Sequence, residues 1–426
     1  MKSNANVIRN SLSLFFIYLY VLIAPLGTLF RFSEHEGALG VSSILLLILV
    51  FMFSIDMIYV FFKNQFFFYL FLLLIILLFT SMNSYDPSST YLYLVQLSIY
   101  VSFAAAIYRV SFSRKDLKLV FLFLAIGTFI STFLTLIDYS GLMDIPRVNE
   151  LQIVTRLGGE NVQQISGLFP RRSAMAAYFA LILPIFFVLS IQKKNIYWKL
   201  FLSLCFLLSF LCLLFTHNLA GIIAILVSCF FYLIFGYRAT FLEKIKKISI
   251  ILLILLAFGT IISLKLPEIV DVYLFRIGSH FQTPSTQVNG LVDRQIESDN
   301  MRLYFFKFSL ASINGDPFGH GLSKLVTDKY GIIDPHNIIT QFIWATGILG
   351  FIWMFFGILI FFKIIKLPKY SNDSLTTYLT AIKYGLFSWF ICGMAHNIIF
   401  TGIAWLFLGM LINIRKQLYK IPQRTR

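Results

Sequence analysis

The sequence predicts an all-α integral membrane protein with about twelve transmembrane helices and a large loop between the ninth and tenth. Three observations lead to this fold class: 58% of the residues are hydrophobic, only 13% are charged, and the mean hydropathy is +0.83. A soluble domain is normally about half apolar and roughly a quarter charged. Apolar runs recur along the whole chain, so residues 1–426 are expected to form a single polytopic membrane domain.

A transmembrane helix needs roughly 20 apolar residues, with a working range of about 17–25. Backbone polar groups must pair internally in lipid, so such runs have to be helical. No small-residue cleavage site follows the first run, which is therefore expected to be an uncleaved span. The predicted spans are 11–30, 38–62, 66–82, 91–108, 119–137, 173–192, 199–216, 219–236, 248–266, 347–366, 375–393 and 397–414.

The basic residues predict the orientation. With a cytoplasmic N-terminus and alternating sides, 22 of the 35 Lys and Arg fall in inner segments, mostly short ones. The positive-inside rule is most reliable for short loops. Both termini are therefore expected in the cytoplasm.

Two long connections, 138–172 and 267–335, then lie outside and are expected to be periplasmic. The second exceeds the length of an ordinary connection. Its stretch 296–314 has apolar residues at helical spacing, which favours an amphipathic helix on the membrane surface.

Other classes fit poorly. The net charge of +16 comes from short clusters between apolar runs, and no basic face could follow a nucleic-acid backbone. The four cysteines all lie inside apolar runs, where a disulfide framework or metal site is not expected.

The stretch from Asp334 to Asn337 (DPHN) is the most informative one for chemistry. Pro335 favours an extended Asp334, and a helix could begin near His336. A histidine at the water boundary suits general-base work, and a helix N-terminus favours an anionic group such as a diphosphate. The alternative is an ordinary interfacial helix cap.

Outer arginines are the second feature, because the positive-inside rule discourages them. Arg171 and Arg172 follow residues 167–170 (GLFP) at the mouth of the sixth span, where guanidinium groups could hold a phosphate in a bidentate manner. Solvated loop charge is the alternative for each single arginine. The six outer arginines considered are Arg156, Arg171, Arg172, Arg276, Arg294 and Arg302.

Two more His-Asn pairs, His217-Asn218 and His396-Asn397, fall at outer turns. Three histidines at one face could suggest a metal, but their partners are asparagines and the spacing matches no ligand motif. Asp56 and Lys383 are the main charges within spans; they leave a transporter possible without favouring it.

At His336-Asn337, followed by nine residues and then Gly347-Ile348-Leu349-Gly350, the sequence resembles the O-antigen ligase and polymerase superfamily. Residues 314–321 (NGDPFGHG) resemble the Pro-x-x-Gly-x-Gly segment that precedes this element in many members. The resemblance covers roughly residues 150–365. It implies a glycosyltransferase C-like fold in the bacterial inner membrane, with the active site facing the periplasm.

One departure concerns residues 216–221 (THNLAG), where many members carry a Ser-Arg-Gly or Thr-Arg element. No arginine stands there. If that arginine binds diphosphate in relatives, Arg171 or Arg172 must replace it here, or the donor site differs, with His217 at the equivalent position.

The resemblance implies metal-independent glycosyl transfer without a cofactor, from an undecaprenyl-diphosphate-linked glycan that enters from the membrane lipid. His336 would take the proton from the acceptor hydroxyl, and Asn337 would orient His336 or a sugar hydroxyl. The diphosphate would be held by Arg171 and Arg172, with Arg302, Arg156 and His217 as further candidates.

The acceptor separates two functions. Lipid A–core as acceptor makes the protein an O-antigen ligase, which the His-Asn segment favours. A second lipid-linked repeat unit makes it a polysaccharide polymerase, which the outer arginines and the departure at 216–221 keep open. A flippase or transporter is the third possibility and would not need His336.

Overall fold

The computed structural model describes the chain from Lys2 to Lys420 with several gaps. The residues outside the description are 28, 31–39, 144, 146–151, 156–160, 193–194, 238, 248, 250–259, 261–263, 265–289, 329–330, 334–336, 366–373 and 397–400, together with residue 1 and residues 421–426.

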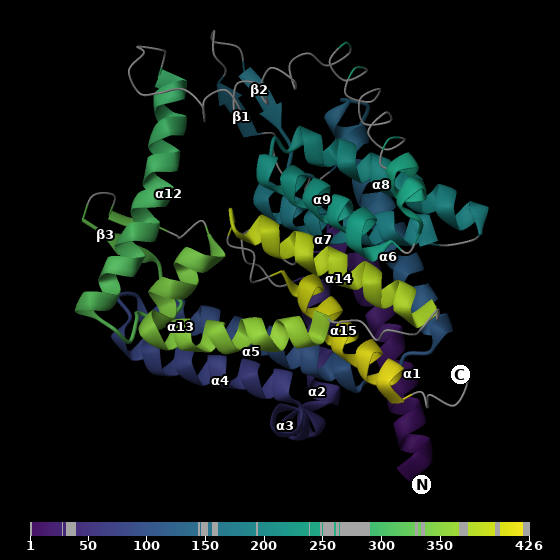
Figure 1. Ribbon diagram of the computed structural model, residues 1–426, viewed down its shortest axis with the longest axis horizontal. Helices are drawn as coiled ribbons and strands as arrows, with labels where there is room; N and C mark the ends of the chain where they lie inside the picture. The colour runs from purple at the N-terminus through teal and green to yellow at the C-terminus, as the bar shows by residue number, and fades with distance from the viewer. Residues whose placement is uncertain are drawn as a thin grey trace.

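Helices make up most of the described chain (Figure 1). They are α1 (Lys2–Ile23), α2 (Val41–Met52), α3 (Ser54–Lys63), α4 (Gln65–Thr80), α5 (Pro87–Arg109), α6 (Arg114–Tyr139), α7 (Arg172–Gln192), α8 (Ile196–Phe215), α9 (Leu219–Phe231), α12 (Gly290–Gly315), α13 (Ile338–Ile365), α14 (Ser374–Gly393) and α15 (Gly402–Lys420). Short helical turns are η1 (Ala24–Leu26), η2 (Ser81–Asn83) and η3 (Tyr232–Gly236). The strands form two antiparallel hairpins, β1 (Gln152–Thr155) with β2 (Asn161–Gln164), and β3 (Leu325–Thr327) with β4 (Gly331–Ile333).

The prediction of an all-α membrane protein is confirmed. Eight helices of the described chain are long and apolar enough to cross a membrane, or up to nine if one bent pair counts as a span. Helices α14 and α15 cover the last two predicted spans but are less apolar. The predicted span 248–266 lies largely outside the described residues. The count of twelve therefore stays a prediction.

The second predicted span, 38–62, is broken rather than continuous. Helices α2 and α3 meet at Phe53 with a bend of 72°. At 1.5 Å per residue the 12 residues of α2 reach only about 18 Å, well short of the roughly 30 Å hydrocarbon core. Beyond the bend, Asp56 lies 2.7 Å from Arg9 and 3.2 Å from Arg109. The bend thus places this carboxylate beside two guanidinium groups, which hydropathy alone could not predict.

Contacts between helices reveal their relative directions. The thiol of Cys205 donates to the Ala125 carbonyl at 3.7 Å, and that of Cys212 to the Thr132 carbonyl at 3.6 Å. Both pairs advance in the same sense, so α6 and α8 are parallel. This is the relation that alternating sides predict for the fifth and seventh spans.

Helices α9 and α14 run in opposite directions. Ser228 donates to the Tyr384 carbonyl at 2.7 Å, whereas Ala224, one turn earlier in α9, clusters with Cys392, two turns later in α14. The start of α9 therefore lies beside the end of α14, again as alternation predicts.

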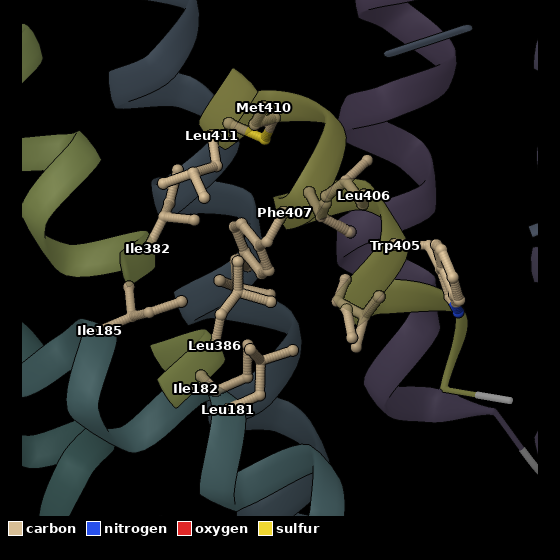
Figure 2. Close-up of a cluster of buried hydrophobic side chains, with 14 of the residues drawn as sticks. Leu181, Ile182, Ile185, Ile382, Leu386, Trp405, Leu406, Phe407, Met410 and Leu411 are labelled. Atoms are coloured by element: carbon tan, nitrogen blue, oxygen red, sulfur yellow. The ribbon is translucent and has the colours of Figure 1, made fainter. Parts of the chain in front are cut away.

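The centre of the bundle is the contact of α7, α14 and α15 (Figure 2). Helix α7 is apolar on every side and buries most of its length, as expected for a helix surrounded by others. The labelled side chains that meet there are Leu181, Ile182, Ile185, Ile382, Leu386, Leu406, Phe407, Met410 and Leu411, whereas Trp405 lies on the other side of α15.

Helix α12 runs across the direction of α4 and α5 at one edge of the bundle (Figure 1). It contains the whole predicted amphipathic stretch 296–314, so the prediction of a helix there is confirmed. Its buried residue Phe305 packs with Leu325 of β3 and Trp344 of α13. The predicted place of this helix on the membrane surface stays a prediction.

Candidate functional site

Helix α13 is broken at Gly347, where φ is +53° and ψ is −140°. The loop that precedes β3 fits into the break. The backbone N–H groups of His320 and Gly321 donate to the carbonyls of Trp344 and Ala345 at 3.0 and 2.9 Å. These bonds satisfy carbonyls that a broken helix would otherwise leave unpaired. We call this arrangement of residues 316–323 against 344–348 the α13 junction.

Glycine is required on both sides of the α13 junction. The Ile348 N–H donates to the Pro317 carbonyl at 2.8 Å, and a Cβ on Gly347 would collide with that same carbonyl oxygen. Gly319 has φ +77°, and a Cβ there would come within 2.6 Å of the Gly347 nitrogen. The segment 314–321 and the segment 347–350, which the sequence presents as separate motifs, are thus in direct contact.

His320 is buried at the centre of this junction, with 4% of its surface exposed. Its ring lies 4.0 Å from the Trp344 ring and 4.8 Å from that of Tyr85. Its Nδ1 lies 3.3 Å from the Asn83 carbonyl oxygen and 3.6 Å from a carboxylate oxygen of Asp316. Burial lowers the pKa of His320, against smaller opposing effects of Asn83 and Asp316. His320 therefore joins α13 to the segment between α4 and α5, as a neutral aromatic group.

Asn337 begins α13. Its side-chain oxygen accepts hydrogen bonds from the N–H groups of Ile339 at 2.7 Å and Thr340 at 3.0 Å, the usual role of an N-cap residue. A helix start beside His336 was expected, and it is found. His336 itself lies outside the described residues, so its predicted catalytic role stays a prediction.

A second group of polar residues lies where α8 turns into α9. The side-chain oxygen of Asn218 accepts from the Gly221 N–H at 3.0 Å and caps α9. The Nδ2 of the same side chain lies 2.9 Å from Nε2 of His396, just beyond α14. Nε2 also lies 3.2 Å from the side-chain oxygen of Asn218, so the direction of this hydrogen bond is set by the tautomer of His396. Asn218 and His396, which belong to two His-Asn pairs distant in sequence, are thus joined by a hydrogen bond.

His217 precedes this cap with a φ of +53°, in the left-handed region that residues other than glycine rarely adopt. It is buried, and its N–H donates to the Leu214 carbonyl at 3.0 Å. Such strain costs on the order of 1–3 kcal/mol and tends to persist at functional sites. The identity of His217 as a site residue stays a prediction.

Small residues bring the arginine pair to the same place. Ala177, Ala180, Ala224 and Cys392 pack together, so the first halves of α7 and α9 and the last turn of α14 are adjacent. Arg171 is exposed immediately before α7, and Arg172 is half-buried in its first turn. We call this end of α7, α9 and α14, with Arg171, Arg172, His217, Asn218 and His396, the three-helix end.

The sequence treated the arginine pair and the two His-Asn pairs as separate features; the structure joins Asn218 to His396 and packs their helices against α7, which begins at the arginine pair. It also adds His320 and Trp344, which no sequence motif marked as central. Arg302 lies in α12, with its side chain outside the description, and Arg156 lies outside the described residues altogether. Among the described residues, no three His, Cys, Asp or Glu side chains are grouped in a way that could hold a metal ion.

Residues 204–355 match the family model for O-antigen ligases. The matched segment includes the start of α9, all of α12 and the α13 junction, whereas Arg171, Arg172 and His396 lie outside it. No curated protein sequence matches the chain. The family match confirms the resemblance to the O-antigen ligase superfamily.

Proposed function

We propose that this multi-pass membrane protein is a glycosyltransferase that moves a glycan from an undecaprenyl-diphosphate carrier to lipid A–core, the reaction of an O-antigen ligase. The family match supports a glycosyltransferase-like enzyme that acts on lipid-linked glycans. The observation that carries the proposal is the three-helix end, where α7, which begins at the arginine pair, packs against α9 and α14, and where Asn218 and His396 are joined by a hydrogen bond.

The arginine pair would hold the diphosphate of the donor. Guanidinium groups bind phosphate oxygens in a bidentate manner, and they retain their charge at any accessible pH. The start of α7 adds the positive end of the helix dipole, which favours an anion. Arg171 and Arg172 would therefore stabilise the negative charge that grows on the diphosphate as it leaves. Arg302, Arg156 and His217 are the further candidates for this contact.

The chemical step is attack by an acceptor hydroxyl on the anomeric carbon of the donor sugar. His336 would take the hydroxyl proton while the new C–O bond forms and the bond to the diphosphate breaks. The carrier leaves as undecaprenyl diphosphate. The side-chain oxygen of Asn337 caps α13. The Nδ2 amide nitrogen of the same side chain would therefore orient His336 or a sugar hydroxyl.

Diphosphate is already a good leaving group, so charge stabilisation by arginine could replace a divalent cation. The proposal therefore includes neither a metal nor a cofactor. The partners would be the lipid-linked donor, the lipid A–core acceptor and the surrounding membrane lipid.

The proposed location is the bacterial inner membrane, with both termini in the cytoplasm and the site facing the periplasm. The positive charge bias supports this orientation. The described helix contacts agree with it: the start of α1 lies against the end of α5 through Asn10 and Ser111, 2.7 Å apart between Oδ1 and N.

A polysaccharide polymerase is the second candidate. The observation that favours it is the turn at 216–218, where many members of the superfamily carry an arginine and this chain instead has a buried His217 and a capping Asn218. A different acceptor or donor arrangement would accompany that change. The polymerase would use the same donor and the same arginine pair.

The test is a deletion strain complemented with the wild type, with His336→Ala or with Arg171→Ala/Arg172→Ala, followed by lipopolysaccharide gels. Lys307→Ala, an exposed cation on α12, is the matched control. We expect a full ladder from the wild type and the control and none from the other two variants at equal membrane levels. Bare core indicates a ligase, and core with one repeat unit indicates a polymerase. A full ladder from His336→Ala would overturn the catalytic role.

A further inference from the structure

A groove lies between the first halves of α6 and α8, at the end of the bundle opposite the three-helix end. Its volume is about 690 Å³, within the range of roughly 300–1,000 Å³ that is typical of ligand pockets. The residues that line it are Lys118, Leu122, Ile126, Asn195, Tyr197, Trp198 and Phe201.

The floor of the groove is apolar and its mouth is polar. Leu122, Ile126 and Phe201 form the apolar part, and the rings of Trp198 and Phe201 lie 6.2 Å apart along one wall. Lys118 is exposed at the mouth. A ligand with a hydrocarbon chain and an anionic head would match both parts.

The indole of Trp198 provides an independent observation. Its Nε1–H is buried but has no hydrogen-bond acceptor among the residues that the structure describes. Buried donors in native proteins are normally paired, so such a group signals a missing acceptor. The backbone N–H of Trp198 is already bound by the side-chain oxygen of Asn195 at 3.1 Å. Because this nitrogen is closed to solvent, a rotation of the indole toward the groove is needed to bring it to an acceptor beside Lys118.

Charge around the groove selects the kind of acceptor. Arg114, Lys115 and Lys118 lie in the first turns of α6, and Lys199 lies at the start of α8. Asp116 is the acidic residue among them, and it is engaged by the Tyr18 hydroxyl and the Ser113 N–H. The excess of positive charge favours an anionic head over a zwitterionic one.

We infer that this groove binds an anionic glycerophospholipid, with its phosphate between Lys118 and the Trp198 Nε1–H and an acyl chain along Leu122, Ile126 and Phe201. The 20 residues of α8 separate the groove from Asn218 by about 30 Å at 1.5 Å per residue. The lipid is therefore distinct from the glycan donor, and the inference does not depend on the proposed function.

The bound lipid fills the space between α6 and α8 on the side where the charge bias predicts the cytoplasm. Further along, the two helices are joined directly through Cys205 and Cys212. A ligand that binds only the folded protein raises its stability in proportion to the logarithm of its concentration. Phosphatidylglycerol should thus stabilise the protein more than phosphatidylethanolamine does.

The experiment uses the full-length protein in detergent with added phosphatidylglycerol or phosphatidylethanolamine. Native mass spectrometry measures the retained lipid, and a thermal shift measures stability. Lys118→Gln and Trp198→Phe are the test variants. Lys63→Gln, at the end of α3 and away from the groove, is the matched control for a lost positive charge.

We expect Lys118→Gln and Trp198→Phe each to weaken retention of phosphatidylglycerol about fivefold, as loss of one partly exposed polar contact does, and Lys63→Gln to leave it unchanged. Both test variants should retain normal elution on size exclusion. Equal retention of the two lipids, unchanged retention in both test variants, or an equal loss in Lys63→Gln would each overturn the inference.

Discussion

The left-handed backbone of Gly347 fixes where α13 changes direction and what can pack there. Gly347 holds φ +53°, and the Pro317 carbonyl occupies the space in which a side chain would begin. The residues on either side are bonded to residues 317–321 rather than to their own helix. One glycine therefore controls the geometry of the whole α13 junction.

We predict that Gly347→Ala lowers the free energy of unfolding by at least about 1–3 kcal/mol, the usual cost of a side chain in a sparsely populated backbone region. Gly315→Ala is the control, because a Cβ there meets no atom within 4 Å. Thermal unfolding in detergent measures both. An equal, small effect of the two substitutions would contradict the role of Gly347.

His320 makes the stability of the α13 junction depend on pH. Burial lowers the pKa of His320 in the folded state below its ordinary value of about 6.5. The unfolded chain then binds more protons between the two pKa values, so stability rises with pH in that interval. The contribution is complete above about pH 6.5 and is lost as the pH falls through the folded pKa.

We therefore predict that the unfolding temperature falls on acidification below about pH 6.5 and that His320→Phe flattens this fall. Phenylalanine keeps the contacts with Trp344 and Tyr85 but cannot take up a proton. Unfolding temperatures at a series of pH values test this. A variant with the same pH dependence as the wild type would show that other groups are responsible.

The hydrogen bond between Asn218 and His396 should couple the two residues in function. We predict that Asn218→Ala and His396→Ala each reduce the rate of glycan transfer. The loss of activation free energy in the double variant should be smaller than the sum of the two single losses by about 0.5–3 kcal/mol, as is usual for residues in contact. Asn64→Ala removes a comparable cap, that of α4, and serves as the control. Additive effects of the two substitutions would contradict the coupling.

At the scale of elements, the bent pair α2–α3 depends on a charge cluster. Helix α3 exposes Ile55, Ile58, Tyr59 and Phe62 along one face and buries Met57 on the other. An exposed apolar face suits contact with lipid, while Asp56 is held by Arg9 and Arg109. The bent pair thus combines an apolar face suited to lipid contact with a carboxylate that is paired with two arginines.

We predict that Asp56→Asn destabilises the protein by about 1–2 kcal/mol, between the values for exposed and buried ion pairs, because it leaves two arginines side by side. Asp328→Asn, which removes an exposed carboxylate, should have little effect. Unfolding temperatures at low and high salt would test the pair. An equal fall in unfolding temperature in the two variants would contradict the proposed role of Asp56.

Individual helices were largely predictable because long apolar runs must be helical in lipid. The positions of the breaks were not. Gly347 and Phe53 interrupt continuous apolar sequence, and the polar contacts near each break come from distant residues, Pro317 in one case and Arg9 with Arg109 in the other. Hydropathy reports the composition of a run and contains no information on such contacts.

At the scale of the whole molecule, the helix contacts agree with the alternation that the charges predict. Helix α9 runs antiparallel to α14, and the α13 junction lies beside Asn83, just after α4. Helices α5 and α15 are parallel, with Asn413 bonded to the Val110 carbonyl at 2.6 Å.

The candidate site was predictable in its parts and not in its assembly. Residue type and position at an outer turn marked the arginine pair and Asn218. The small residues Ala177, Ala224 and Cys392, which bring those turns together, look like ordinary residues of apolar runs. His320 carried no signal beyond its place between two glycines.

Reconstituted transfer is the most direct test of the central claim. Purified protein in liposomes would receive an undecaprenyl-diphosphate-linked glycan and lipid A–core, and the product would be followed with wild type, His336→Ala and Lys307→Ala. We predict glycan on lipid A–core with wild type and Lys307→Ala, and none with His336→Ala at an unchanged unfolding temperature. Transfer by His336→Ala at the wild-type rate would contradict the account. So would a wild type that forms no product with either lipid A–core or a second lipid-linked repeat unit as the acceptor.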